Sequence, residues 1–168
     1  PAFDVAIEET KAEVQQIIDN PAAPDFANTI VALDLAGEKL ERIKGIFFNL
    51  NSAETSDEMQ EIAQKIAPKL SDLGNDISLN EQLFARIKDV HSQKDNLVLN
   101  FEESTLLEKT YRRFVHSGAN LNETDKAKYR EITKELSTLG LQYQQNVLAE
   151  TNAYELLITD EKDLSGLP

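Results

Sequence analysis

Apolar side chains recur every three or four positions along most of this chain, a spacing that places them on one face of an α-helix. The pattern predicts six helices, which cover approximately residues 3–19, 30–50, 55–77, 80–90, 106–115 and 122–152. The segments between them are short, so helices that follow one another in sequence are expected to lie beside one another. We therefore expect an all-α fold, an antiparallel array of about six helices, several of them long, in a single domain over residues 1–168.

Capping residues and prolines mark the ends of these helices. Pro21 and Pro24 end the first helix, because proline lacks an N–H group and disfavours helical geometry in the residue before it. Asp25 or Asn28 is expected to cap the second helix. Residues 55–58 have the Thr-x-x-Glu spacing of a capping box, so we expect Thr55 to start the third.

Asn80 and Asn122 are the expected N-caps of the fourth and sixth helices, and Gly118 is expected to end the fifth in a left-handed conformation. Residues 97–101 are interpreted as a lead-in to the fifth helix.

Two glycines and a proline lie inside the predicted helices. Gly37 and Gly45 each weaken helix propensity by about 1 kcal/mol relative to alanine, and either can let a neighbouring helix approach closely. Pro68 removes one backbone hydrogen bond, so we expect a bend between residues 64 and 68.

The last predicted helix is the longest, at about seven turns of ~3.6 residues. Its apolar residues form one stripe that we expect to face the core: Tyr129, Ile132, Leu136, Leu139, Tyr143 and Val147. Packing is therefore the expected role of both tyrosines. After this helix, residues 154–158 form a short apolar run, and residues 159–161 can cap a further turn.

Composition narrows the classes of function. The 168 residues are 40% hydrophobic and 28% charged, and no apolar run approaches the ~18 residues of a membrane span. The net charge of −13 would repel a phosphate backbone, which argues against nucleic acid as a partner. The chain has no cysteine, so disulfides and thiolate metal sites are excluded. The compartment stays open between the cytoplasm, which we favour, and the periplasm.

Candidate chemistry is sparse. A zinc protease motif of the H-E-x-x-H type needs two histidines one helical turn apart, but His91 and His116 are 25 positions apart. A di-iron motif needs a glutamate three residues before histidine, where this chain has Lys88 and Arg113. Nucleophile motifs and phosphate-binding glycine loops are also missing. We therefore assign no catalytic, cofactor-binding or metal-binding residue.

Paired carboxylates are the remaining candidates for acid–base chemistry. They are Glu8 with Glu9, Glu102 with Glu103, and Asp160 with Glu161. We interpret them as solvated helix faces, and we interpret the two histidines as helix-end surface residues whose rings cover apolar neighbours.

Short sequence motifs in the predicted loops and helix ends resemble those of a known protein family. They lie at residues 24–30 (PDFANTI), 47–50 (FFNL), 68–70 (PKL), 79–84 (LNEQLF), 114–119 (FVHSGA), 145–148 (QNVL), 151–152 (TN) and 164–168 (LSGLP). In this order the chain resembles the N-terminal region of the zinc oligopeptidases related to thimet oligopeptidase, especially the bacterial peptidyl-dipeptidases (dipeptidyl carboxypeptidase) and oligopeptidase A. The resemblance spans nearly the whole chain.

The resemblance implies a larger helical enzyme that folds as two halves around a deep channel. It implies a zinc ion held by H-E-x-x-H and a downstream glutamate, an activity on short peptides, and in the peptidyl-dipeptidases the release of C-terminal dipeptides. That zinc motif lies beyond this chain, so the chain alone is expected to be inactive and to contain no cofactor. Both ends of the chain are expected to be boundaries within a longer protein.

The expected partners are a catalytic half of the same protein and oligopeptide substrates. The expected role is a wall or lid of the substrate channel. A free-standing helical module that binds a partner helix in an apolar groove is the alternative. Without its catalytic half, the chain is expected to expose an apolar face through which it can self-associate.

Overall fold

The computed structural model describes residues 1–166, and every regular element in this range is helical. The elements are α1 (Ala2–Ile18), the π-helix η1 (Phe26–Val31), α2 (Ala32–Leu35), α3 (Glu38–Ala53), α4 (Asp57–Ser78), α5 (Glu81–Ser92), the short 3-10 helix η2 (Lys94–Asn96), α6 (Phe101–His116), α7 (Glu123–Ala153) and the 3-10 helix η3 (Glu161–Leu164). The predicted all-α fold with about six substantial helices is confirmed.

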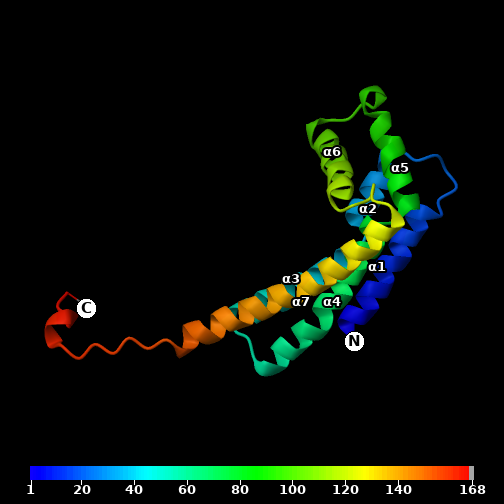
Figure 1. The fold of residues 1–168 in the computed structure, drawn as a ribbon. Coiled ribbons are helices and arrows are strands. Elements are labelled where there is room, and N and C mark those ends of the chain that lie inside the picture. The colour runs from blue at the N-terminus through cyan, green and yellow to red at the C-terminus, as the bar shows by residue number, and fades with distance from the viewer. Residues whose placement is uncertain (167–168) are drawn as a thin grey trace.

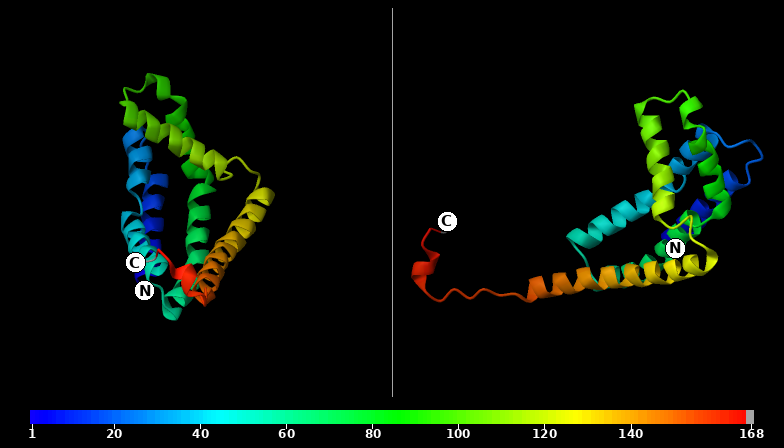
Figure 2. Two further views of the ribbon diagram at one scale, coloured as in Figure 1. Left: turned by 90° about the vertical axis from the view of Figure 1, so that its left-hand side faces the viewer. Right: turned by 45° about the horizontal axis from the view of Figure 1, so that its top comes forward.

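The helices form an elongated array (Figure 1). α1 packs against α3 and α4, while α5 and α6 form a hairpin at one end. The longest helix, α7, lies along α4 rather than along α6, its predecessor in sequence. Beyond α7 the chain leaves the body in an extended conformation and reaches η3, far from the other helices in Figure 1 and in the right-hand view of Figure 2.

Two groups of buried side chains hold the array together. The larger joins α1, η1, α2, α5 and α6 around Ile30, Leu83, Ile87 and Phe114, all of which are almost completely buried. The smaller joins α1, α3 and α4. In it, three rings meet edge to face: Phe3 lies 5.4 Å from Phe47, which lies 5.1 Å from Phe48. Neither group draws a residue from the C-terminal half of α7.

The second predicted helix is not continuous, which corrects the expectation of one helix over residues 30–50. The backbone passes through η1 and α2 and then breaks at Gly37, whose φ is +81°. A Cβ at Gly37 would lie 3.1 Å from Thr10 Cγ2 of α1, and its N–H group donates to Glu13 Oε2 at 2.7 Å. Gly37 therefore permits the close approach of α1, whereas Gly45 has no such neighbour within 4 Å.

Several caps agree with the sequence. Asp25 and Asn28 together form a capping box at η1, each side chain accepting a hydrogen bond from the other's backbone N–H group. Asn80 and Asn122 cap α5 and α7, and Gly118 follows α6 with a φ of +88°.

Other helix starts differ from the sequence prediction. Ser56, not Thr55, caps α4, because its Oγ accepts from the Met59 N–H group while the Thr55 hydroxyl donates to Asn51. The capping box of Asn100 with Glu103 at α6 was not predicted. α4 is one helix through Pro68, and the bend expected there stays a prediction.

Candidate functional site

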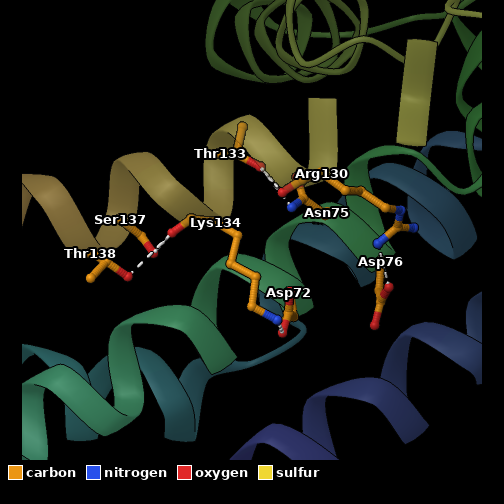
Figure 3. A network of polar contacts seen from close by, with 8 residues as sticks. All are labelled: Asp72, Asn75, Asp76, Arg130, Thr133, Lys134, Ser137 and Thr138. Carbon is orange, nitrogen blue, oxygen red and sulfur yellow. Dashed lines mark hydrogen bonds and ion pairs between the residues drawn. The ribbon is translucent and has the colours of Figure 1, made fainter. Parts of the chain in front are cut away.

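α7 contacts α4 through polar side chains (Figure 3). Arg130 Nη1 pairs with Asp76 at 2.7 Å, and Lys134 Nζ pairs with Asp72 at 2.8 Å. The two pairs run in opposite sequence directions, so the helices are antiparallel. Between them, Asn75 donates from Nδ2 to Thr133 Oγ1 at 2.8 Å, and the Asn75 side chain is buried.

The same contact face continues along α7 in both directions. Gln64 of α4 donates to the Gln145 side chain at 3.0 Å, and Leu141 is the buried apolar residue of α7. At the other end Lys126 Nζ pairs with Glu81 of α5 at 2.6 Å and with Glu123 at 2.9 Å. The hydrogen bond that Lys126 donates to the Glu81 carboxylate is the largest cause of the raised pKa of Lys126. Acidic side chains of α4 and α5 therefore position α7 through ion pairs with its basic side chains.

The polar contact face between α4 and α7 was not predicted, although the sequence contains a signal for it. Residues 72, 75 and 76 are Asp, Asn and Asp, and residues 130, 133 and 134 are Arg, Thr and Lys. Spacings of three and four place each set on one helix face, and the two sets complement one another in charge.

The predicted core stripe of α7 faces solvent, which corrects the expectation that it packs inside. Of its members, Leu139 is 50% exposed and Tyr143 is 71% exposed. We call Ile132, Leu136, Leu139, Tyr143 and Val147 the outer face of α7. Two residues turn an α-helix by about 200°, so Leu139 lies opposite the buried Leu141. Because the α4 side of α7 is the polar one, the apolar stripe points outward.

The two tyrosines of the stripe have different surroundings. Tyr129 is partly buried and lines a cavity of about 490 Å³ where α1, α4, α6 and α7 meet, together with Asn75 and Phe114. Tyr143 is exposed, so the packing role expected for it is wrong in this structure.

Charge is distributed unevenly along α7. Eight of the thirteen residues in 123–135 are charged, whereas the fourteen residues in 136–149 include none. Four of the five outer-face residues lie in or next to this uncharged stretch, beginning at Leu136. Depletion of charge with an exposed aromatic residue is the composition of a protein interface core, and an exposed apolar stripe is expected to have a partner.

The two histidines take different positions. His91, at the end of α5, is largely buried, with its ring stacked on Tyr111 at 3.9 Å and its Nε2 2.6 Å from Glu108 Oε2. The hydrogen bond from His91, followed by that from Lys94, lowers the pKa of Glu108. His116 is exposed at the end of α6. His91 thus covers an aromatic neighbour as expected, but it is largely buried rather than on the surface, and it joins α5 to α6.

Several of the candidate carboxylates have structural partners. Glu8 pairs with Lys11, Glu9 pairs with Lys39 of α3, and Glu103 completes the cap of α6. Over residues 1–160 and 162–166, no three histidine or acidic side chains gather closely enough to hold a metal ion. In the same range, no helix has the length and apolarity needed to cross a membrane.

Known proteins with similar sequences are peptidases. Over 167 residues, or 99% of this chain, it is 40% identical to dipeptidyl carboxypeptidase of Escherichia coli, and the match covers 24% of that protein. Oligopeptidase A of Salmonella typhimurium is 31% identical over all 168 residues, which cover 25% of its length. Over nearly its whole length the chain is therefore similar to the N-terminal quarter of peptidases of the thimet oligopeptidase family.

The chain also resembles saccharolysin of Saccharomyces cerevisiae, with 28% identity over 159 residues. No protein-family profile matches the chain. The chain spans about a quarter of the length of these relatives and corresponds to their N-terminal quarter. The resemblance based on the short sequence motifs is therefore confirmed. The last of these motifs, at residues 164–168, ends outside the described residues.

Proposed function

We propose that this chain is the non-catalytic N-terminal region of a zinc peptidase that hydrolyses short oligopeptides and releases C-terminal dipeptides. One observation carries the proposal: 99% of the chain aligns at 40% identity with a dipeptidyl carboxypeptidase, of which it covers 24%. In this proposal, the zinc site and the catalytic residues belong to the other three quarters of the protein.

The donors in this chain do not fit a catalytic zinc site. Such a site needs three side-chain ligands and an open position. His91, near the end of α5, already contacts Glu108 and stacks on Tyr111. His116 is the last residue of α6. Glu8 and Glu9 pair with lysines, and Glu103 caps α6. These contacts support a structural role for the region.

In the proposed enzyme, the helices of this region form part of the wall of the substrate channel. The two buried clusters make the array rigid, because packed interiors resist deformation. A rigid channel admits an extended peptide and excludes a folded protein, so the enzyme selects substrates by steric rejection. The region would therefore set the size limit of substrates and leave the bond cleavage to the catalytic part.

The test uses the full-length protein and a variant that lacks residues 1–153. Both are incubated with a short peptide and with a folded protein that carries the same peptide as an internal segment, and products are identified by mass spectrometry. We expect the intact enzyme to release dipeptides from the short peptide alone, and to lose this activity when a chelator removes zinc. The deletion is expected to relax the size limit or to destabilise the enzyme. An equally stable, equally selective deletion variant contradicts the wall role.

The exposed outer face of α7 also favours a second candidate, a free-standing helical module that binds a partner helix. The reading frame separates the two. A continuation of several hundred residues with an H-E-x-x-H helix supports the peptidase, and a stop codon soon after residue 168 supports the binding module. A catalytic role for this chain alone is tested by adding zinc and a short peptide to it, and we expect no cleavage above background.

A further inference from the structure

The outer face of α7 differs from an ordinary solvated helix surface in two respects. It is apolar along four turns, and its C-terminal part lies in the stretch of fourteen residues that has no charged side chain. Apolar side chains continue past the helix: Tyr154, Leu156 and Leu157 are exposed in the extended segment that follows. Exposed apolar side chains therefore recur from Ile132 to Leu157.

We propose that the outer face of α7 is the surface on which the remainder of the full-length peptidase docks. This inference rests on the proposed function and adds the place of contact to it. In the relatives, about three quarters of the polypeptide lies outside the matched region. A domain interface within one chain is built from apolar and aromatic side chains with little charge at its centre. Leu136, Leu139 and Tyr143 supply that composition.

A second copy of this chain fits the surface less well. Each copy has a net charge of −13, and the charged residues that border the uncharged stretch, Glu135 and Glu150, are both acidic. Two copies would therefore bring like charges together.

A substrate peptide also fits the surface less well than a folded partner. An extended peptide has unpaired backbone N–H and C=O groups, and a helix in mid-course offers no free backbone groups to pair with them.

Thiol labelling in the full-length protein tests the docking. The chain has no cysteine of its own, so Leu139→Cys introduces one reporter on the outer face. Lys128→Cys is the matched control, since Lys128 lies in the charged part of the same helix, four residues before the outer face begins, with a side chain 68% exposed. Labelling by a maleimide is followed on the peptide that contains each position. We expect residue 139 to react about tenfold more slowly than residue 128, or slower still, because a covered side chain reacts only when the interface opens.

Equal labelling rates at the two positions would overturn the proposal. Protection of residue 139 that disappears when the protein is diluted would also overturn it, because the occupant would then be a second copy. Protection that requires an added peptide would assign the surface to substrate instead. In a second measurement, Leu139→Asp is expected to lower the thermal midpoint of the full-length protein, and Lys128→Asp is expected to leave it unchanged.

The labelling does not depend on activity. A full-length protein without peptidase activity that still protects residue 139 contradicts the proposed function and keeps the docking surface. An active peptidase in which residue 139 is as reactive as residue 128 contradicts the docking surface alone.

Discussion

α5 and α7 have the same kind of apolar pattern and opposite fates. In α5 the residues spaced by three and four positions, Leu83, Ile87 and Val90, are all buried between α1, η1 and α6. In α7 the residues with the same spacing are exposed, and only Lys126 and Leu141 of its 31 residues are buried. The comparison shows that periodicity indicates an apolar helix face, while the surrounding fold decides whether that face is covered.

The physical reason lies in the helix that each one meets. α5 meets apolar side chains, such as Phe114 of α6, whose ring is parallel to that of Phe84 at 6.2 Å. α7 meets Asp72, Asn75 and Asp76 of α4, and burying those groups against leucine would leave them unpaired. Consequently α7 turns its basic and hydroxyl side chains toward α4 and its outer face, which includes Leu136 and Leu139, away from it.

The largest expected difference comes from removing one leucine from each helix. Leu83→Ala creates a cavity in the larger core and is expected to cost about 2–5 kcal/mol of unfolding free energy. Leu139→Ala in the same 168-residue chain is expected to change it by less than about 0.5 kcal/mol, since the side chain is already half exposed. Urea unfolding followed by circular dichroism measures both. Similar costs for the two variants would mean that the outer face is covered within this chain.

The contact between α4 and α7 gives the next largest effect. Thr133→Val removes the acceptor of the buried Asn75 amide and is expected to cost about 1–3 kcal/mol, because a buried donor is left unpaired. Lys134→Ala removes only a half-exposed ion pair and should cost less than about 1 kcal/mol. Thr133→Ser keeps the hydroxyl and serves as the control. If Lys134→Ala were the more damaging, the ion pairs rather than the buried amide would hold α7.

A substitution at a glycine of α7 tests whether the surface beside it is open or occupied in the 168-residue chain. Gly140 lies inside the helix, and a Cβ there would have no neighbour within 4 Å. Gly140→Ala is therefore expected to stabilise the 168-residue chain by up to about 1 kcal/mol through helix propensity. Gly37→Ala is the opposing control and should destabilise, because of its positive φ and the nearby Thr10. A loss of stability with Gly140→Ala would show that this side of α7 is occupied.

These comparisons also explain which features of the structure could be predicted from the sequence. The helices, most of their caps and the family resemblance could be predicted from local patterns. Examples are Asn80 before α5 and the PDFANTI motif, which contains the capping box of η1. The break at Gly37 could not be predicted, because its cause is Thr10 on another helix. The exposure of the outer face could not be predicted from periodicity, because what covers a helix depends on tertiary contacts. No site residue was predicted, so none is tested by the structure.

The smallest expected effect concerns the contact that joins α5 to α6, and it depends on pH. The hydrogen bonds from His91 and Lys94 lower the pKa of Glu108 below its ordinary value of 4.5. A carboxyl group with a lowered pKa stabilises the folded state above its unfolded pKa, and this contribution disappears as the pH falls through the folded pKa. Glu108→Gln should therefore lower the urea midpoint at pH 7, and this loss should become smaller as the pH falls below 4.5 toward the lowered pKa of the folded state. The effect should be small, because the Glu108 side chain is 46% exposed and solvent screens the contact. Glu135→Gln, which removes the same charge from the exposed side of α7, should show no such pH dependence. An equal loss in both variants would mean that net charge, and not the joint between α5 and α6, controls stability in this range.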